Sequence, residues 1–73
     1  MIAVELGDFV VRTVRERHEG ISMVDLRAEV LREYGTAVGL YDLDRTLDAL
    51  TFQGEIRYSR RFGTFYAVPD GGS

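Results

Sequence analysis

Apolar residues recur at helical spacing near the start of the chain. They lie three and four residues apart and share one face: Leu6, Phe9, Val10 and Val14. This spacing predicts an amphipathic helix over about residues 3–18, with a charged face toward water. Gly20 is expected to end the helix, and Ile21 to begin a short extended segment.

A second helix is predicted to follow Ser22. Ser22 and Asp25 have the spacing of a capping box, in which the serine hydroxyl accepts from a first-turn amide. The apolar stripe of this helix again has steps of three and four, and Leu31 widens it: Met23, Leu26, Val30 and Tyr34. Gly35 suits a left-handed end, and Val38 is expected to tuck under the helices from the turn beyond it.

A third helix is predicted from Asp42, which is the expected N-cap, to Gly54. Its buried seam has the spacing i, i+4, i+7: Leu43, Leu47 and Leu50. After Gly54 the period of the pattern changes to two, which is typical of strands.

The alternating segment predicts a β-hairpin. Ile56 and Tyr58 fall on one side of the first strand, with Arg57 and Ser59 on the other. The second strand covers residues 64–68 and ends at Pro69, which cannot donate to a ladder. Residues 60–63 form a basic tip between them.

Three helices followed by a hairpin predict an α+β fold, because a lone hairpin is marginal in water and must cover the helices. A chain of 73 residues and 8.3 kDa has room for one core. We therefore expect a single domain at 1–68 and a flexible C-terminal tail at 69–73.

Composition narrows the class of protein. No cysteine is present, which excludes disulfides and thiolate metal sites, and no apolar run approaches the ~20 residues that span a bilayer. The start of the chain lacks the pattern of a secretory signal, so a cytoplasmic location is expected. The net charge is −3, so any nucleic-acid contact must come from a local basic patch.

Nothing in the sequence predicts an enzyme. The lone His18 has no partner for a metal site or a proton relay, and no phosphate-binding glycine motif is present. Asp44 and Asp48 lie on a convex helix, where no pocket would hold a substrate. We expect no catalytic residue, metal, cofactor or small-molecule substrate.

The stretch 47–56 resembles the motif L-x-x-L-x-x-x-G-x-I of the winged-helix variant of the helix-turn-helix family. The segment 20–22 is similar to the small first strand and N-cap of that family, so the resemblance covers about residues 6–68. The Gly54-Glu55-Ile56 opening and the Phe65-Tyr66 pair also resemble the C-terminal winged helix of archaeal minichromosome maintenance helicases. The resemblance implies a three-helix fold with a two-stranded wing, and a small DNA-binding regulator or replication accessory.

The resemblance implies that the exposed side of the third helix reads the major groove and that the wing touches a phosphate strand or the minor groove. On that helix Tyr41 and Arg45 would be the contacts, but Asp44 and Asp48 would repel phosphates. The wing offers a stronger cluster: Arg57, Ser59, Arg60, Arg61 and Thr64. An alternative is a solvated helix face, with its aspartates partly paired to Arg45, and a hairpin whose charge only prevents aggregation.

A second function of another class is protein binding, to a partner or to a second copy of the chain. The residues that would carry it are acidic or aromatic: Tyr41, Asp44, Asp48, Phe52 and Phe62. The alternative for Phe52, which we favour because a small domain needs every large side chain, is that it folds under the wing against Tyr58 or Phe65.

Overall fold

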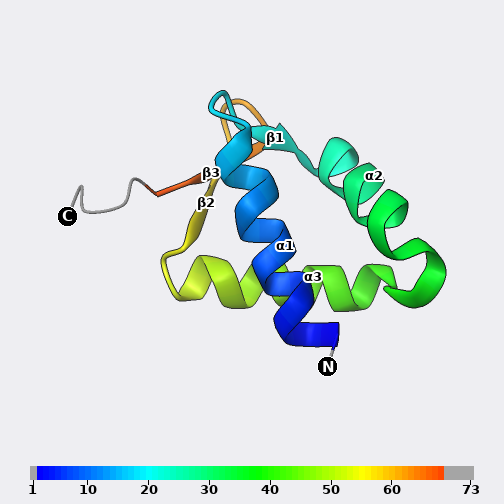
Figure 1. Cartoon of the computed structure of the whole chain (residues 1–73). Helices are drawn as coiled ribbons and strands as arrows, with labels where there is room; N and C mark the ends of the chain where they lie inside the picture. Colours follow the sequence, from blue (N-terminus) through cyan, green and yellow to red (C-terminus); the bar gives the residue numbers. More distant parts are fainter. Residues whose placement is uncertain (1, 69–73) are drawn as a thin grey trace.

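The chain folds as three helices and a small antiparallel sheet, as Figure 1 shows. The computed structural model describes the backbone of residues 2–68 and the side chains of residues 5–68. The elements follow in this order: α1 (Ile2–Glu16), β1 (Ile21–Ser22), α2 (Met23–Tyr34), the 3-10 helix η1 (Gly35–Ala37), α3 (Leu40–Phe52), β2 (Ile56–Ser59) and β3 (Thr64–Ala67). The α+β class is confirmed. Strand β3 ends at Ala67, one residue before the predicted end at Val68, and Pro69 and the predicted tail at 69–73 lie outside the described residues.

Helix α1 buries the predicted apolar stripe. Leu6, Val10 and Val14 are buried in the core, and the half-buried ring of Phe9 packs beside them at its edge. The helix ends at Glu16, two residues before the predicted end at His18. The Gly20 N–H donates to the Arg17 carbonyl oxygen over 2.8 Å, and this turn replaces the last helical residues.

Helix α2 begins as predicted. Ser22 has extended backbone angles, and its Oγ accepts from the Asp25 N–H over 3.1 Å. Leu26 and Val30 are buried, but Leu31 is 59% exposed, so its predicted place in the stripe is wrong. One residue turns a helix by about 100°, which carries Leu31 past the edge of the face that Val30 buries.

The end of α2 is fastened to the start of α1 by Tyr34. Its hydroxyl donates to the Glu5 carbonyl oxygen over 3.2 Å, and its ring meets Phe9 edge to face, with centroids 5.5 Å apart. Burial raises the pKa of Tyr34, and the nearby carboxylates of Glu5 and Glu33 raise it further.

Helix α3 begins at Leu40, two residues before the predicted N-cap. Gly39 occupies the cap position, and Asp42 reaches back from the first turn to accept from the Gly39 N–H over 3.3 Å. The predicted seam is confirmed as buried: Leu43, Leu47 and Leu50. Val38 is half-buried against the core, also as predicted.

The sheet has three strands in the order β1-β3-β2, all antiparallel. The predicted hairpin of β2 and β3 is confirmed, but it is not isolated, because β1 pairs with β3 at Ile21 and Phe65. Ile21, Ile56 and Phe65 are buried on the inner face and join the helical core. The short first strand that the resemblance implied is therefore present, and it ties the hairpin to the helices.

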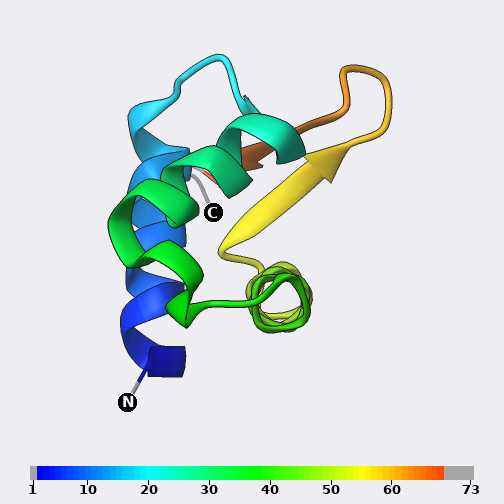
Figure 2. The same ribbon diagram turned by 90° about the vertical axis from the view of Figure 1, so that its right-hand side faces the viewer.

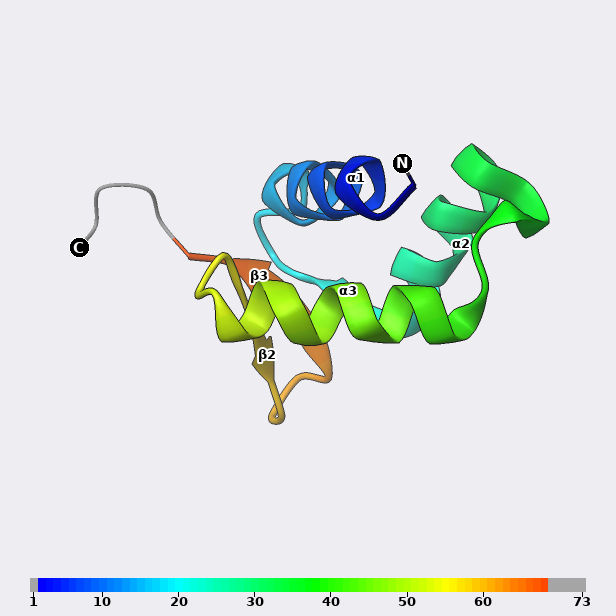
Figure 3. The same ribbon diagram turned by 90° about the horizontal axis from the view of Figure 1, so that it is seen from below.

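The loop between β2 and β3 projects away from the helices, as Figure 2 shows. In the view of Figure 3 the loop extends past α3, on the side away from α1. A partner molecule can therefore reach the loop without meeting α1 or α2 first.

Candidate nucleic-acid interface

The projecting loop is held by hydrogen bonds at its base. The Gly63 N–H donates to the Ser59 carbonyl oxygen over 2.7 Å, and the Phe62 N–H donates to the Ser59 Oγ over 3.3 Å. Gly63 has a φ of 64°, a conformation that glycine adopts without strain. These contacts leave the side chains of Arg60, Arg61 and Phe62 exposed at the tip.

The outer face of the sheet carries the third arginine of the hairpin. Arg57 lies directly opposite Tyr66 in the ladder, and Ser59 lies opposite Thr64. Because side chains alternate along strands, these four residues share the face opposite Ile56 and Phe65. We call Arg57, Arg60 and Arg61, with the loop between the strands, the basic hairpin.

The guanidinium groups of the basic hairpin have no carboxylate partner within residues 5–68. The salt bridge in that part of the chain joins Arg17 to Glu29 over 3.2 Å, between α1 and α2. The three charges of the basic hairpin are therefore open to an anion from outside. Arginine binds phosphates, as it does carboxylates, in a fork geometry with two hydrogen bonds.

Ser59 and Thr64 have structural contacts of their own. The Ser59 hydroxyl caps the loop, and half-buried Thr64 faces Gly20, where an added Cβ would lie 2.9 Å from the Thr64 Oγ1. The hydroxyl hydrogen of Ser59 remains able to donate to a phosphate. Their predicted role as DNA contacts stays a prediction.

The outward face of α3 carries the other predicted site residues, and all of them are exposed: Tyr41, Asp44, Arg45, Asp48 and Phe52. The Arg45 guanidinium lies 5.7 Å from the centre of the Tyr41 ring, a cation–π contact. The exposure of this face agrees with the alternative of a solvated helix face, but within residues 5–68 neither aspartate forms the expected salt bridge to Arg45. The face therefore presents two carboxylates and one cation.

The favoured interpretation of Phe52 is wrong. Its ring is 93% exposed, whereas Tyr58 packs on Phe65 with ring centroids 4.9 Å apart. Tyr41 and Phe52 lie eleven residues apart on α3, about 16 Å along its axis, so they do not form one patch. Tyr41 and Phe52 are therefore separate features of α3, and the third aromatic predicted for protein binding, Phe62, lies on the basic hairpin.

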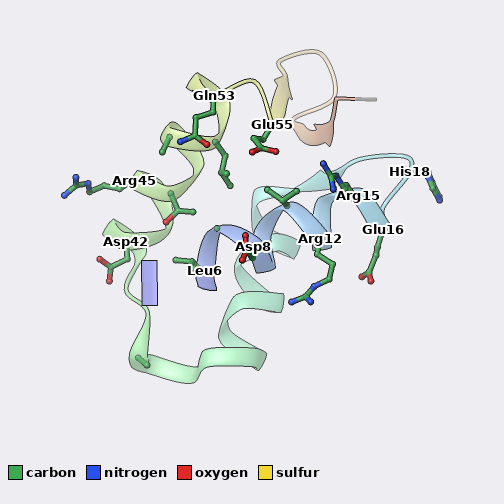
Figure 4. A pocket seen from close by; sticks show the side chains of 16 residues that line it. Leu6, Asp8, Arg12, Arg15, Glu16, His18, Asp42, Arg45, Gln53 and Glu55 are labelled. Carbon is green, nitrogen blue, oxygen red and sulfur yellow. The ribbon is translucent and has the colours of Figure 1, made fainter. Parts of the chain in front are cut away.

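An open groove runs between α1 and α3, and sequence analysis did not predict it (Figure 4). Its floor is apolar and includes Leu6, Val11 and Leu50. Its rim mixes both signs of charge: Asp8, Arg12, Arg15, Asp42, Arg45 and Glu55. His18 is exposed at one end. In the described part of the chain, no three side chains of the metal-binding types come together.

Two further features were missed. Val24 and Leu31 on α2 and Leu40 on α3 are exposed apolar residues beside a shallow groove between the two helices. The spacing of Val24, Ala28 and Leu31 was a second helical stripe that could have revealed this surface.

The second missed feature is the position of Arg57 opposite Tyr66. Predicting it required the register of the hairpin, which the length of the loop could have supplied.

Comparison of the chain with protein-family models, with curated proteins and with solved structures found no match. Within residues 2–68, none of the helices has the length and apolar character required to traverse a bilayer.

Proposed function

We propose that this chain is a winged-helix protein that binds double-stranded DNA through the basic hairpin. The order of elements supports the winged-helix assignment, with three helices before a projecting hairpin. The local motif supports it too, because Leu47, Leu50 and Ile56 are buried and Gly54 turns the chain with a φ of 81°. In this arrangement β2 and β3 form the wing.

The observation that carries the proposal is the gathering on one projecting hairpin of three arginines that form no salt bridge within residues 5–68. Arg57 lies on the sheet face, and Arg60 and Arg61 lie at the tip, so their charges can meet successive phosphates along one strand of a duplex. Each neutralised phosphate releases counterions and strengthens binding. A local cluster can do this even though the net charge of the chain is −3.

Helix α3 is a poor reader of the major groove in this chain. Asp44 and Asp48 lie on its exposed face, where they would approach phosphates that Arg45 alone attracts. A carboxylate in the major groove accepts usefully only from cytosine N4. We therefore place the main contact on the basic hairpin and expect weak sequence preference.

The test is a fluorescence anisotropy titration of duplex DNA at several salt concentrations. Replacing both Arg60 and Arg61 with alanine should weaken binding to all sequences alike and reduce the slope of log K against log salt by about two. The matched control, Arg27→Ala with Arg32→Ala, removes two exposed arginines from α2 and should leave the slope unchanged. An unchanged slope in the hairpin variant, or no binding at about 50 mM salt, would overturn the proposal.

A second candidate function is protein binding through the outward face of α3. The observation that favours it is Phe52, a large apolar side chain that is 93% exposed and contributes nothing to the core. Carboxylates flank it along the helix at Asp48 and Asp44, which suits a partner with a basic surface. The two functions make opposite predictions for the substitution Asp48→Arg.

A further inference from the structure

The tip of the basic hairpin carries an aromatic ring that the fold does not use. Phe62 is 72% exposed, and the loop is held by Ser59 and Gly63 without any contribution from the ring. An exposed phenylalanine among arginines gains nothing for the core and lowers solubility. A ring in this position is suited to contact with a ligand that has an apolar face.

Arginines accompany the aromatic rings of this hairpin. The Arg61 guanidinium lies 5.4 Å from the centre of the Phe62 ring, and Arg57 lies opposite Tyr66 across the ladder. Tyr66 is 38% exposed on the outer face of the sheet. The Arg61 guanidinium covers only one face of the Phe62 ring, and every nucleic-acid base has a flat face that can stack on the other.

We propose that the basic hairpin binds unpaired bases by stacking, with Phe62 as the first platform and Tyr66 as the second. The ligand is a single-stranded segment next to a duplex, so the inference rests on the proposed DNA-binding function and narrows its substrate. Arg57, Arg60 and Arg61 hold the phosphates on either side of the stacked bases. Phe62 and Tyr66 are four positions apart, at most about 13 Å along the strand, which is the length of about four stacked nucleotides.

We expect the basic hairpin to prefer unpaired bases to an intact duplex, because an unpaired base can stack on a ring without a base step being unstacked first. Stacking of one base on an aromatic ring is worth about 5- to 150-fold in affinity. Inserting Phe62 into a continuous duplex must first unstack a base step, and one ring on one hairpin does not recover that cost. A base that is already unpaired carries no such penalty.

The experiment compares a blunt duplex of about 20 base pairs with the same duplex carrying a single-stranded extension of about four nucleotides. A third ligand has an extension of abasic nucleotides, which keeps the phosphates and removes the bases. The wild-type chain should bind the base-containing extension at least about 5-fold more tightly than either of the other two. A 2-aminopurine in the extension should lose fluorescence on binding.

Phe62→Ala should abolish the fluorescence change and lower the affinity for the base-containing extension to that for the blunt duplex. Phe52→Ala removes a phenylalanine from α3 that is more exposed than Phe62, at 93% against 72%, and should keep both signals. Phe62→Trp should keep them as well. Equal affinity for the three ligands, or a preference that survives Phe62→Ala and Tyr66→Ala together, would overturn the inference while blunt-duplex binding still supported the proposed function. Absence of binding to every ligand would overturn both.

Discussion

The centres of the Tyr58 and Phe65 rings lie 4.9 Å apart, and the two residues are directly opposite each other in the ladder of β2 and β3. This cross-strand pair closes the sheet side of the core, because Phe65 is buried beneath it. Phe52, at the end of α3, lies outside this pair and is 93% exposed. The pairing therefore secures the hairpin on the core without any contribution from Phe52.

The two phenylalanines should respond differently to the same substitution. Phe65→Leu removes a buried ring and its contact with Tyr58, and we expect it to lower the free energy of unfolding by about 1–2 kcal/mol. Phe52→Leu should change it by less than about 0.5 kcal/mol, since the ring is exposed. Urea denaturation of the two variants measures this difference, and equal losses would show that Phe52 is part of the core.

Gly20 is required where the chain turns from α1 into β1. It has a φ of 94°, and a Cβ there would lie 2.9 Å from the Thr64 Oγ1 and 3.2 Å from the Phe65 carbonyl oxygen. Gly20→Ala should therefore cost at least about 1–2 kcal/mol of stability. The control is Gly7→Ala in α1, where an added Cβ meets nothing within 4 Å. This substitution should stabilise the protein by about 0.5–1 kcal/mol, because alanine favours a helix more than glycine does. Thermal unfolding compares the pair, and a tolerated Gly20→Ala would contradict the β1–β3 pairing.

Tyr34 should make stability depend on alkaline pH. Its pKa is raised above 10.0 in the folded state, first by burial and then by Glu5 and Glu33, so the folded state holds the phenolic proton more tightly than the unfolded state does. This contribution to stability is fully present below about pH 10 and is lost as the pH rises through the folded pKa.

Tyr34→Phe keeps the ring on Phe9 but removes the hydrogen bond to Glu5, so it should cost about 0.5–1.5 kcal/mol at neutral pH. Above pH 10 the stability of the variant should fall less steeply than that of the wild-type chain, because the hydroxyl with the raised pKa is gone. Denaturant titrations between pH 7 and about 11 test both effects. Parallel curves at all pH values would contradict a raised pKa.

Asp48→Arg separates the two candidate functions. If the protein binds DNA, replacing this exposed carboxylate on α3 with a cation should tighten binding to any duplex and increase the salt slope by up to about one. Asp8→Arg makes the same change of charge on α1 and should have a smaller effect on DNA binding. If α3 instead binds a protein, Asp48→Arg should weaken that complex and leave DNA affinity unchanged.

The sequence by itself determined the elements whose signals are local. The leucine seam at Leu43, Leu47 and Leu50, the cap at Ser22 and the alternation after Gly54 all depend on neighbours within a few residues, and the structure has each of them. The arginines of the basic hairpin were predictable for the same reason, because a turn between two short strands places its residues at the tip.

Only the tertiary structure decided which side chains found a distant partner. Ile21 pairs with Phe65, Arg57 faces Tyr66, and Phe52 and Leu31 are left in solvent. Helical spacing states that a residue can reach the core, but several residues compete for each place in so small a core. Packing against residues far along the chain determines which of them is buried, and a local sequence pattern carries no information about those distant residues.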